Sequence, residues 1–396
     1  MQTVRESPRP LRIMLVISNL EFGGAQRQVL HLARSLDPSR FEARICCLSP
    51  YMPLLEQAPD PGLRVSVIAK RSKYDLSVVP RLRRLMETTG TDIAHSFLFD
   101  AQTATRLAGR WAGAVVVDSE RNANYAMPLK RRLVCRMTRG CSDLVIANSH
   151  AGADFHRRTH RHPTASYRVV HNGIDVDRFR PLPRSAVRAE LGIEQDELVL
   201  GMFGSFKPQK NHAMFFRSAA GLVERFPRLR LLVAGDELAG GIGGSVEHKR
   251  QTLDLVRDLG IGPRCIFLGN RADPERLYNA CDVVVLPSRF EGTPNVVLEA
   301  LSCGVPVVAT DVGDCSRILP DGRIGYIVAS DDERALADRL RALLADGGLR
   351  ERFGAEARRW VTERFSLAQL ASRTGDIYES AWRERVTSPE RAPSIL

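Results

Sequence analysis

The sequence predicts an α/β fold with two doubly wound domains, each built on a parallel sheet. Short runs rich in β-branched residues alternate with longer amphipathic stretches along the whole chain, an order typical of βαβ units. Apolar runs such as VVVLP and VPVVAT suit strands that are covered on both faces. The polar stretch 176–195, which contains Pro and Arg, interrupts the pattern before a new strand. We interpret this stretch as a linker between the two domains.

Each half of the chain supplies its own set of strands. In the first half, β-branched runs predict strands at 12–18, 43–48, 64–68, 92–96, 114–118, 144–148 and 168–171. Helical periodicity predicts helices between them at 24–35, 78–88, 100–111, 127–141 and 151–157. In the second half, strands are expected at 198–203, 229–234, 265–268, 283–287, 305–310 and 325–328, with helices between them. A final amphipathic stretch, 367–382, predicts one or two helices.

The positive charge is concentrated in the first half. The net charge is +11, but residues 1–180 hold 28 Lys and Arg against 16 Asp and Glu, whereas residues 181–396 hold 29 against 30. Clusters at 81–85 and 130–139 dominate the surplus. They indicate either a solvated helix face or contact with an anionic membrane surface or acceptor. Nucleic acid is not expected as a partner, because aromatic residues are only 6% and do not alternate with the basic ones.

The eight cysteines and the hydropathy suggest a cytoplasmic protein. The cysteines form no CxxC pair and no cluster with histidine, and most lie in apolar runs. We therefore expect reduced, buried thiols. No apolar run reaches the ~18 residues that a transmembrane helix needs, and the apolar stretch 11–20 is too short and too strand-like for a signal peptide.

The stretch SRFEGTPNVVLEALSCGVPVVAT, residues 288–310, carries two glutamates eight residues apart, Glu291 and Glu299. It predicts a loop after a strand, then a helix with Thr293 as N-cap and Pro294 in its first turn, ended by Gly304. Loops at the carboxyl ends of parallel strands bind ligands. The backbone N–H groups at this helix start form a natural anion site. These amides belong to Gly292, Thr293, Asn295 and Val296.

Glu299 lies in an otherwise apolar helical segment, where a desolvated carboxylate needs partners. A ribose diol could donate two hydrogen bonds to it. The alternative is a surface glutamate, or one that caps a neighbouring helix. Glu291 can only accept hydrogen bonds, which suits a polyhydroxylated ligand.

Two further strand ends point to the same kind of ligand. GSFKPQKNH, residues 204–212, places Lys207 and Lys210 in a loop that opens a helix, where their ammonium groups could neutralise a diphosphate. In the first half, Gly23 and Gly24 follow a strand and permit close approach of the backbone to a ligand. Solvated lysines and an ordinary Gly-Gly turn remain the alternatives for each motif taken alone.

With these motifs assembled, the chain resembles the family 4 retaining glycosyltransferases of the GT-B fold over residues 11–382. EGTPNVVLEALSCGVPVVAT resembles the family's E-x7-E element, and GGAQ its N-terminal glycine loop. HNGIDVDRF, residues 171–179, and IFLGNR, residues 266–271, resemble its crossover segment and its base-binding loop. The resemblance implies two facing Rossmann-like domains, an acceptor domain at 10–178 and a donor domain at 190–366, with a helix at 367–385 crossing back.

The resemblance also implies roles for individual residues. Lys210, Lys207 and Glu291 would be catalytic, the lysines at the diphosphate and Glu291 at the donor sugar, while Glu299 would bind the ribose. The other donor-binding positions implied are Gly23, Gly24, Ser205, Arg271, Gly292, Thr293, Pro294, Asn295 and Val296. Ser205 replaces an arginine of many relatives, so Lys207 is expected to substitute for it. A first-domain histidine of many relatives is missing, and Asp118, Glu120 or Arg121 is expected to take its role.

The implied activity is retaining transfer of a sugar from a nucleotide-sugar, with UDP expected, to an acceptor hydroxyl. No metal or other cofactor is expected, and Asp175 and Asp177, which look like a metal-binding DxD, are interpreted as structural. The expected acceptor is a lipid-linked glycan or polysaccharide precursor for the cell envelope, used at the inner membrane face. A small soluble or protein acceptor, and a non-catalytic nucleotide-sugar-binding protein, are the alternatives. A Rossmann dehydrogenase is disfavoured, because no G-x-G-x-x-G follows the first strand of either half.

Overall fold

The computed structural model describes residues 9–21, 23–57, 60–72, 75–121, 128–160, 166–238 and 243–387. The chain forms two compact units, one of residues 1–173 and 367–396 and one of residues 174–366. We call them unit 1 and unit 2. Residues 122–127 lie outside the described part, and they include the first residue of the helix expected at 127–141.

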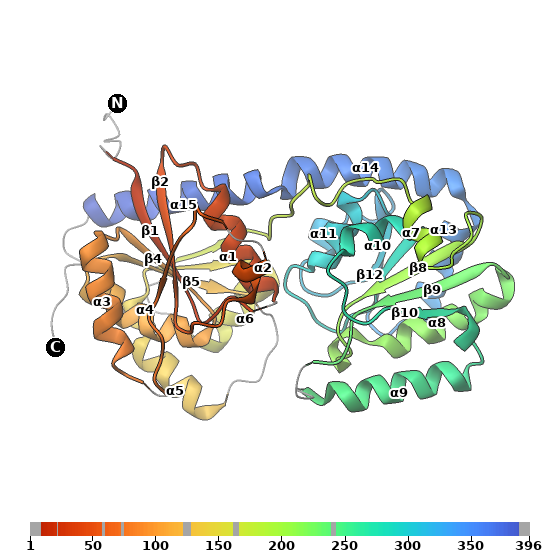
Figure 1. Ribbon diagram of the computed structural model, residues 1–396, viewed down its shortest axis with the longest axis horizontal. Helices are drawn as coiled ribbons and strands as arrows, with labels where there is room; N and C mark the ends of the chain where they lie inside the picture. Colours follow the sequence, from red (N-terminus) through yellow and green to blue (C-terminus); the bar gives the residue numbers. More distant parts are fainter. Residues whose placement is uncertain are drawn as a thin grey trace. The chain divides into compact units, whose positions relative to one another are not determined.

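Unit 1 contains a seven-stranded sheet whose strands are all parallel, in the order β3-β2-β1-β4-β5-β6-β7 (Figure 1). The strands are β1 (Leu11–Ile17), β2 (Phe41–Cys47), β3 (Arg64–Val67), β4 (Ile93–Phe97), β5 (Val115–Glu120), β6 (Leu144–Ala147) and β7 (Ser166–Val169). The helices are α1 (Gly24–Ser35), α2 (Pro53–Gln57), α3 (Val78–Thr89), α4 (Phe99–Trp111), α5 (Leu129–Thr138), α6 (His150–His160) and α15 (Leu367–Thr387).

Unit 2 contains a six-stranded parallel sheet in the order β10-β9-β8-β11-β12-β13. The strands are β8 (Leu198–Phe203), β9 (Leu229–Ala234), β10 (Cys265–Phe267), β11 (Val283–Leu286), β12 (Val307–Thr310) and β13 (Gly325–Val328). The helices are α7 (Ser185–Glu190), α8 (His212–Arg225), α9 (Ser245–Asp258), α10 (Pro274–Ala280), α11 (Asn295–Ser302), α12 (Cys315–Ile318), α13 (Glu333–Ala345) and α14 (Gly347–Phe365).

Helices cover both faces of each sheet, which explains the near-continuous apolar strands. In unit 1, α1 and α15 pack on one face and α3 and α4 on the other. In unit 2, α10, α11 and α14 share one core, while α8, α9 and α13 share the other. The expected fold class, two doubly wound Rossmann-like domains, is therefore confirmed. No helix among the described residues combines the length and hydropathy needed to cross a bilayer.

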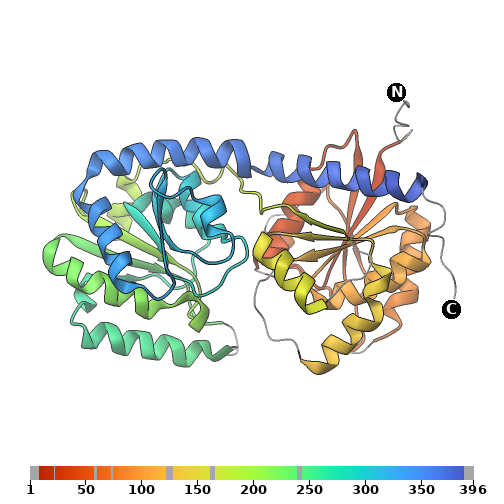
Figure 2. The ribbon, with the colours of Figure 1, turned by 180° about the vertical axis from the view of Figure 1, so that it is seen from behind.

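The C-terminal helix α15 belongs to unit 1, although 193 residues of unit 2 precede it (Figures 1 and 2). The phenol of Tyr378 is fully buried and lies 2.6 Å from Nδ1 of His95 on β4. Burial lowers the pKa of His95 to about 3, so its imidazole is neutral. Arg40 forms ion pairs with Asp376 and Glu379 on the same helix, each at 2.9 Å. Tyr378 and these ion pairs hold α15 against the sheet.

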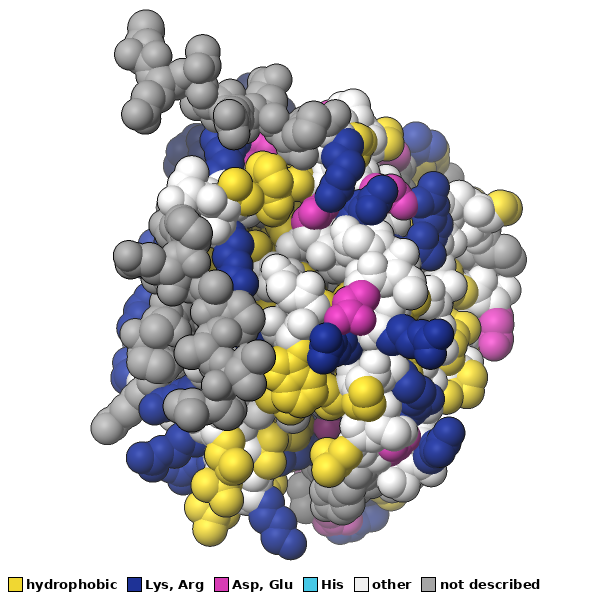
Figure 3. All heavy atoms as spheres, turned by 90° about the vertical axis from the view of Figure 1, so that its left-hand side faces the viewer, with side chains coloured by type: hydrophobic (Ala, Val, Ile, Leu, Met, Phe, Trp, Pro, Cys, Tyr) yellow, Lys and Arg dark blue, Asp and Glu magenta, His cyan; other side chains and the backbone are white. Residues whose placement is uncertain are grey.

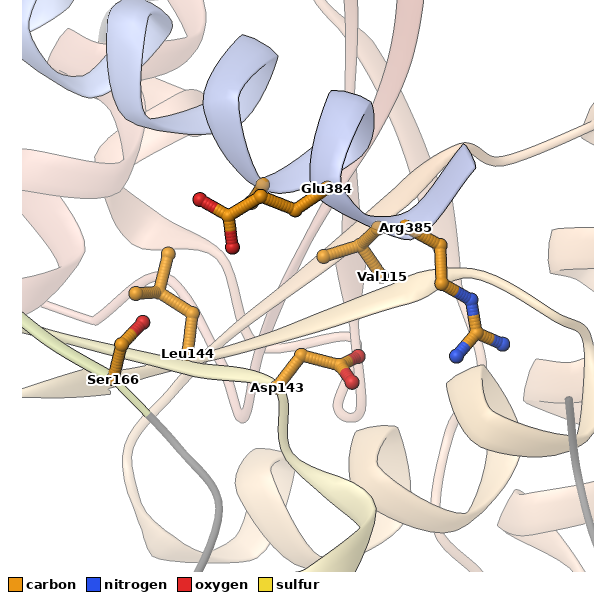
Figure 4. Close-up of a pocket in the computed structure, with 7 residues that line it drawn as sticks. Val115, Asp143, Leu144, Ser166, Glu384 and Arg385 are labelled. Carbon is orange, nitrogen blue, oxygen red and sulfur yellow. The ribbon is translucent and has the colours of Figure 1, made fainter. Parts of the chain in front are cut away.

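The C-terminal end of α15 also closes a small cavity at the amino edge of the sheet (Figure 4). Val115, Leu144 and Ser166 are the first residues of β5, β6 and β7, and they line this cavity of about 160 Å³ together with Glu384 and Arg385. Ligands of doubly wound sheets bind at the opposite, carboxyl edge. The cavity is therefore part of the seating of α15 and not the predicted ligand site.

We predict that Tyr378→Phe destabilises unit 1 by roughly 1–3 kcal/mol, because a buried imidazole nitrogen loses its hydrogen-bond partner. Hydrogen exchange of the whole chain, followed by mass spectrometry, should show faster exchange in β4 and α15 and no change in unit 2. Tyr326→Phe, at a half-buried tyrosine of unit 2, is the matched control and should change the free energy of unfolding by less than about 0.5 kcal/mol. Equal exchange of α15 in Tyr378→Phe and the unsubstituted chain would show that the hydrogen bond does not hold the helix.

Candidate functional site: the carboxyl edge of each sheet

The loops that follow β8 and β11 form the candidate site of unit 2. The strand order reverses between these two neighbouring strands: β9 and β10 continue on one side, and β12 and β13 on the other. Doubly wound sheets bind ligands in the crevice at this reversal. The two loops, residues 204–211 and 287–294, hold most of the donor-binding residues that the sequence predicts.

Direct contacts join these two loops. Lys210 Nζ donates a hydrogen bond to Glu291 Oε1 at 2.7 Å, and the side chains are only 18% and 10% exposed. Gln209 Nε2 donates to the carbonyl of Phe290, and the amide of Arg289 donates to the carbonyl of Gln209, each at 2.8 Å. The predicted phosphate-binding lysine and the predicted sugar-binding glutamate are therefore adjacent in the folded unit.

The loop after β8 is held in shape from beneath. Phe206 is buried and stacks on His212, with ring centroids 4.4 Å apart. Burial lowers the pKa of His212 to about 3, so this ring adds no charge. Lys207 is half-buried, and burial together with the charge of Lys210 lowers its pKa. Ser205, at the position where many relatives were expected to have arginine, is half-buried in the same loop.

The loop after β11 leads into the amino end of α11, as expected, but the helix begins one residue later than predicted. Pro294 is the N-cap, with φ −76° and ψ 107°, and the predicted cap Thr293 lies outside the helix. Its extended ψ keeps Pro294 out of the first turn, so Asn295 is the first helical residue. Gly292, Asn295 and Val296 are half-buried at this edge, whereas Thr293 and Pro294 are buried. The helix ends at Ser302, and Gly304 follows with φ +73°.

Glu299 lies on α11 and is half-buried, not enclosed. Its Oε2 accepts a hydrogen bond of 2.7 Å from the phenol of Tyr278 on α10. Tyr278 is itself buried against Phe203, and burial followed by the charge of Glu299 raises its pKa well above the usual value. A carboxylate is therefore tolerated in this apolar helix because a buried phenol fixes its orientation.

Two glycines that sequence reasoning missed allow these loops to approach closely. A Cβ on Gly313, in the loop after β12, would lie 2.5 Å from the carbonyl oxygens of Glu291 and Gly292. A Cβ on Gly235, after β9, would lie 2.2 Å from the carbonyl oxygen of Gly204. The sequence does place each glycine one to three residues after a predicted strand, Gly235 in AGD and Gly313 in DVGD, and this position could have indicated the close approach.

Arg271 is already bound by carboxylates of unit 2. Its Nε lies 2.8 Å from Asp273, and its Nη2 lies 2.9 Å from Glu190. These two partners raise the pKa of the guanidinium above its usual value. The contacts fix the guanidinium after β10, and the role of Arg271 in donor binding stays a prediction.

The predicted glycine loop of unit 1 follows β1. Gly23 is the N-cap of α1 and Gly24 its first residue. A Cβ on Gly23 would lie 2.3 Å from Oε1 of Gln26, whose amide reaches Asn19 at 3.3 Å. The missing side chain of Gly23 thus leaves room for Gln26 at the amino end of the helix.

The three candidates lie at the carboxyl end of β5, and Arg121, directly after the strand, is the least buried of them. Asp118 is fully buried and pairs at 2.8 Å with Arg106 of α4. Burial alone would raise the pKa of Asp118, but Arg106 holds it below its usual value. Glu120 is 5% exposed and accepts from the amide of Arg121. The expected role of Asp118 at a sugar is therefore wrong, because its carboxylate is committed to Arg106, and the burial of Glu120 disfavours it too.

Arg121 is half-buried at the carboxyl end of β5. Its Nε donates to Ser119 at 2.9 Å and its Nη1 to Asn172 at 2.7 Å, while the guanidinium lies over the ring of Phe97. Burial lowers its pKa to about 10, so it is a cation at neutral pH. Among the described residues, its Nη2 has no hydrogen-bond partner.

Backbone strain marks the same edge of unit 1. Leu98, directly after β4, has φ +70° and ψ 154°, a conformation that costs a non-glycine residue about 1–3 kcal/mol. The strand order of this sheet reverses between β1 and β4. The strain is therefore located at the point where unit 1 would bind a ligand, and no sequence pattern signalled it.

Asp175, the first member of the apparent DxD, accepts hydrogen bonds from the amides of Asp177 and Arg178. Its carboxylate thereby shapes the turn after residue 174, which agrees with the structural interpretation.

The chain matches two family descriptions. "Glycosyl transferases group 1" matches residues 183–360, and "Glycosyltransferase Family 4" matches residues 22–178. The D-inositol 3-phosphate glycosyltransferase of Stackebrandtia nassauensis is 32% identical over 320 residues, covering 76% of this chain and 71% of that protein. The enzyme of the same name from Saccharomonospora viridis is 35% identical over 246 residues, covering 61% of this chain and 56% of that protein.

Solved structures share the fold. The Anabaena protein HepE in complex with UDP has a TM-score of 0.80 at 22% identity, covering 93% of this chain and 100% of that one. Sucrose-phosphate synthase of Thermosynechococcus elongatus has a TM-score of 0.76 at 20% identity, covering 94% and 100%.

We predict that Gly313→Ala destabilises unit 2 by roughly 2–4 kcal/mol, because its methyl group would meet two carbonyls in addition to the cost of a left-handed backbone. Gly322→Ala is the matched control: its φ is also positive, +72°, but a Cβ there meets nothing within 4 Å. This control should cost about 1 kcal/mol. Urea unfolding gives both values, and hydrogen exchange should increase at residues 289–294 in Gly313→Ala alone. Equal costs for the two variants would contradict the close approach.

Proposed function

The chain belongs to the group 1 glycosyltransferases of family 4, and from this premise we propose that it transfers a sugar from a UDP-sugar to a hydroxyl of a small, negatively charged acceptor. The observation that carries the proposal is the 2.7 Å contact between Lys210 and Glu291 at the strand-order reversal of unit 2. It puts a cation suited to phosphate beside a carboxylate suited to sugar hydroxyls.

The donor occupies the loops after β8 and β11. Lys207 and Lys210 neutralise the diphosphate, together with the amides at the start of α11. Glu291 accepts hydrogen bonds from the transferred sugar, and Glu299, oriented by Tyr278, accepts from the ribose hydroxyls. The choice of UDP is supported by the Anabaena protein HepE, whose structures contain UDP and UDP-glucose.

The proposed reaction retains the anomeric configuration. The bond between C1 of the sugar and the diphosphate oxygen breaks first, and the diphosphate takes the electron pair. Lys207 and Lys210 stabilise the charge that develops on it, and the fixed loops need no reorganisation at that moment. The acceptor hydroxyl then attacks C1 from the face that the diphosphate left, and its proton passes to a diphosphate oxygen. Because the lysines supply the positive charge, this mechanism uses no metal ion.

The relatives favour a small acceptor over the lipid-linked glycan that the basic first half suggested. Several curated relatives are named D-inositol 3-phosphate glycosyltransferase, which describes a phosphorylated polyol acceptor. Arg121 of unit 1 suits a phosphate: it is half-buried, its guanidinium lies over the ring of Phe97 and is held by two hydrogen bonds, and its Nη2 has no hydrogen-bond partner among the described residues. We assign the acceptor phosphate to Arg121.

We predict that the purified chain releases UDP from a UDP-sugar and that D-inositol 3-phosphate accelerates the release. A panel of UDP-, GDP- and ADP-sugars, assayed with and without this acceptor, measures both. Glu291→Gln and Lys210→Met should each lower kcat by about 10²–10³-fold, the usual effect of removing one transition-state contact.

The matched control is Glu351→Gln, on the exposed side of α14, which should leave kcat unchanged. Binding of UDP without turnover of any donor would favour the non-catalytic alternative and overturn the proposal.

We predict that Arg121→Gln raises the KM for D-inositol 3-phosphate by roughly 10–100-fold, the loss expected for one charge-assisted contact. The KM for the donor should not change, because the substitution lies in unit 1. Arg121→Lys should recover part of the loss, since it keeps the charge but not the planar fork. Arg158→Gln, on the exposed side of α6, is the matched control. If Arg121→Gln and the unsubstituted chain use an unphosphorylated acceptor equally well, the assignment of the acceptor phosphate to Arg121 stands. If the KM for the phosphorylated acceptor is unchanged in Arg121→Gln, the assignment is refuted.

A further inference from the structure

Helix α5 carries its apolar side chains on the side that faces away from the protein. Leu129, Leu133 and Met137 are 80%, 58% and 76% exposed, whereas Cys135 and Thr138 are its buried residues. At about 100° per residue, the exposed three follow one another at intervals of about 40°. Viewed down the helix axis, the mean direction of these three side chains lies about 170° from the mean direction of Cys135 and Thr138, which is almost the opposite side of the helix. The helix thus has an outward apolar ridge, defined by Leu129, Leu133 and Met137.

Cations flank this ridge on both sides. On the same helical projection, Arg132 and Arg136 lie at one border of the ridge and Lys130 at the other. No Asp or Glu occurs between Arg121 and Ser142. Lys130, Arg132 and Arg136 are exposed, and none has an ion-pair partner among the described residues. Figure 3 shows the end of unit 1 at which Lys and Arg side chains spread, with hydrophobic side chains protruding beside them along the lower margin.

Neither the apolar ridge nor the flanking cations contribute to the packing of α5 in unit 1. The exposed side chains of the ridge add little to the packing of α5, because its buried residues are Cys135 and Thr138. Solubility would require the opposite arrangement, with polar groups outward. An outward apolar ridge bordered by uncompensated cations is instead typical of helices that lie in the interface of a lipid bilayer.

From this arrangement we infer that α5 docks unit 1 on an anionic lipid surface. The ridge enters the boundary between headgroups and acyl chains, and Lys130, Arg132 and Arg136 meet the lipid phosphates. A second copy of the chain does not fit the same surface, because a two-fold interface would place these cations opposite one another. A polyanion such as nucleic acid would match the charge but would leave the ridge in water.

The docking is separate from the proposed transfer. Leu133 and Met137 are on α5, whereas the residues assigned to donor and acceptor follow β8, β11 and β5. Transfer to a soluble acceptor in the absence of lipid should therefore be unaffected by substitutions in the ridge. Failure of docking and failure of the proposed activity are then distinguishable in one set of variants.

The test is sedimentation of the full chain with vesicles of phosphatidylcholine, with and without 30% phosphatidylglycerol. The chain should bind the anionic vesicles, and binding should fall when salt rises from 0.1 M to 0.5 M, because the Debye length shortens from about 10 Å to about 4 Å. Replacing Lys130, Arg132 and Arg136 together by Gln should weaken the vesicle partition constant roughly 100-fold, at about fivefold per cation. Leu133→Ser with Met137→Ser should weaken it at least tenfold with the charge unchanged.

Both variants have matched controls in unit 2. Arg334, Arg352 and Arg359 are exposed arginines of α13 and α14, and replacing all three by Gln removes the same charge. Val246→Ser with Leu253→Ser removes two exposed apolar side chains of α9, which are 52% and 40% exposed. Neither control should alter vesicle binding. Absence of binding by the unsubstituted chain overturns the inference.

Two further outcomes would also overturn it. Full binding by the Leu133→Ser, Met137→Ser variant would mean that the helix recognises negative charge alone, as a site for an acidic polymer does. A dimer in light scattering that becomes a monomer in this variant would assign the ridge to a second copy of the chain.

Discussion

The contact between Lys210 and Glu291 is the interaction on which the candidate site of unit 2 depends. Two opposite charges with little exposure must be desolvated together, and such a pair seldom adds stability on its own. It persists here because two other hydrogen bonds already join the loops: the side-chain amide of Gln209 donates to the carbonyl of Phe290, and the backbone amide of Arg289 donates to the carbonyl of Gln209. A ligand with both phosphate and hydroxyl groups can bind Lys210 through its phosphate and Glu291 through its hydroxyls. These new contacts offset the cost of separating the two side chains. The hydrogen bonds between the loops thus hold Lys210 and Glu291 in position for such a ligand.

Close approach of backbones provides the rest of that organisation. Gly235 lies against Gly204, and Gly313 against Glu291 and Gly292, at distances that no side chain would permit. The loops after β8, β9, β11 and β12 therefore support one another through main-chain contacts. Rigid loops matter for group transfer because dipoles that are already oriented need no reorganisation when charge moves to the leaving group.

The sequence predicted every strand of both sheets, because buried parallel strands are short, apolar and separated by amphipathic helices. Boundaries were less certain: the strand expected at 168–171 is Ser166–Val169, and α11 starts at Asn295. Side-chain partners could not be predicted at all. Asp118 looks available in VVVDSE, yet Arg106, twelve residues earlier on α4, neutralises it in the core. Tyr278 gave no signal as the partner of Glu299, since the pairing depends on how α10 packs beside α11.

The basic first half of the sequence now divides into charges with different roles. Arg106 neutralises Asp118 in the core, and Arg40 holds α15 through Asp376 and Glu379, so both are structural. Arg121 is tied to Ser119 and Asn172 at the carboxyl edge of the sheet. Net charge alone could not separate these residues from a surface patch, because it counts paired and unpaired cations equally. The cations of α5 differ in having no acidic neighbours within their own segment. Their position beside exposed leucines, and not the surplus of charge, is what distinguishes a lipid surface from a soluble anion as their partner.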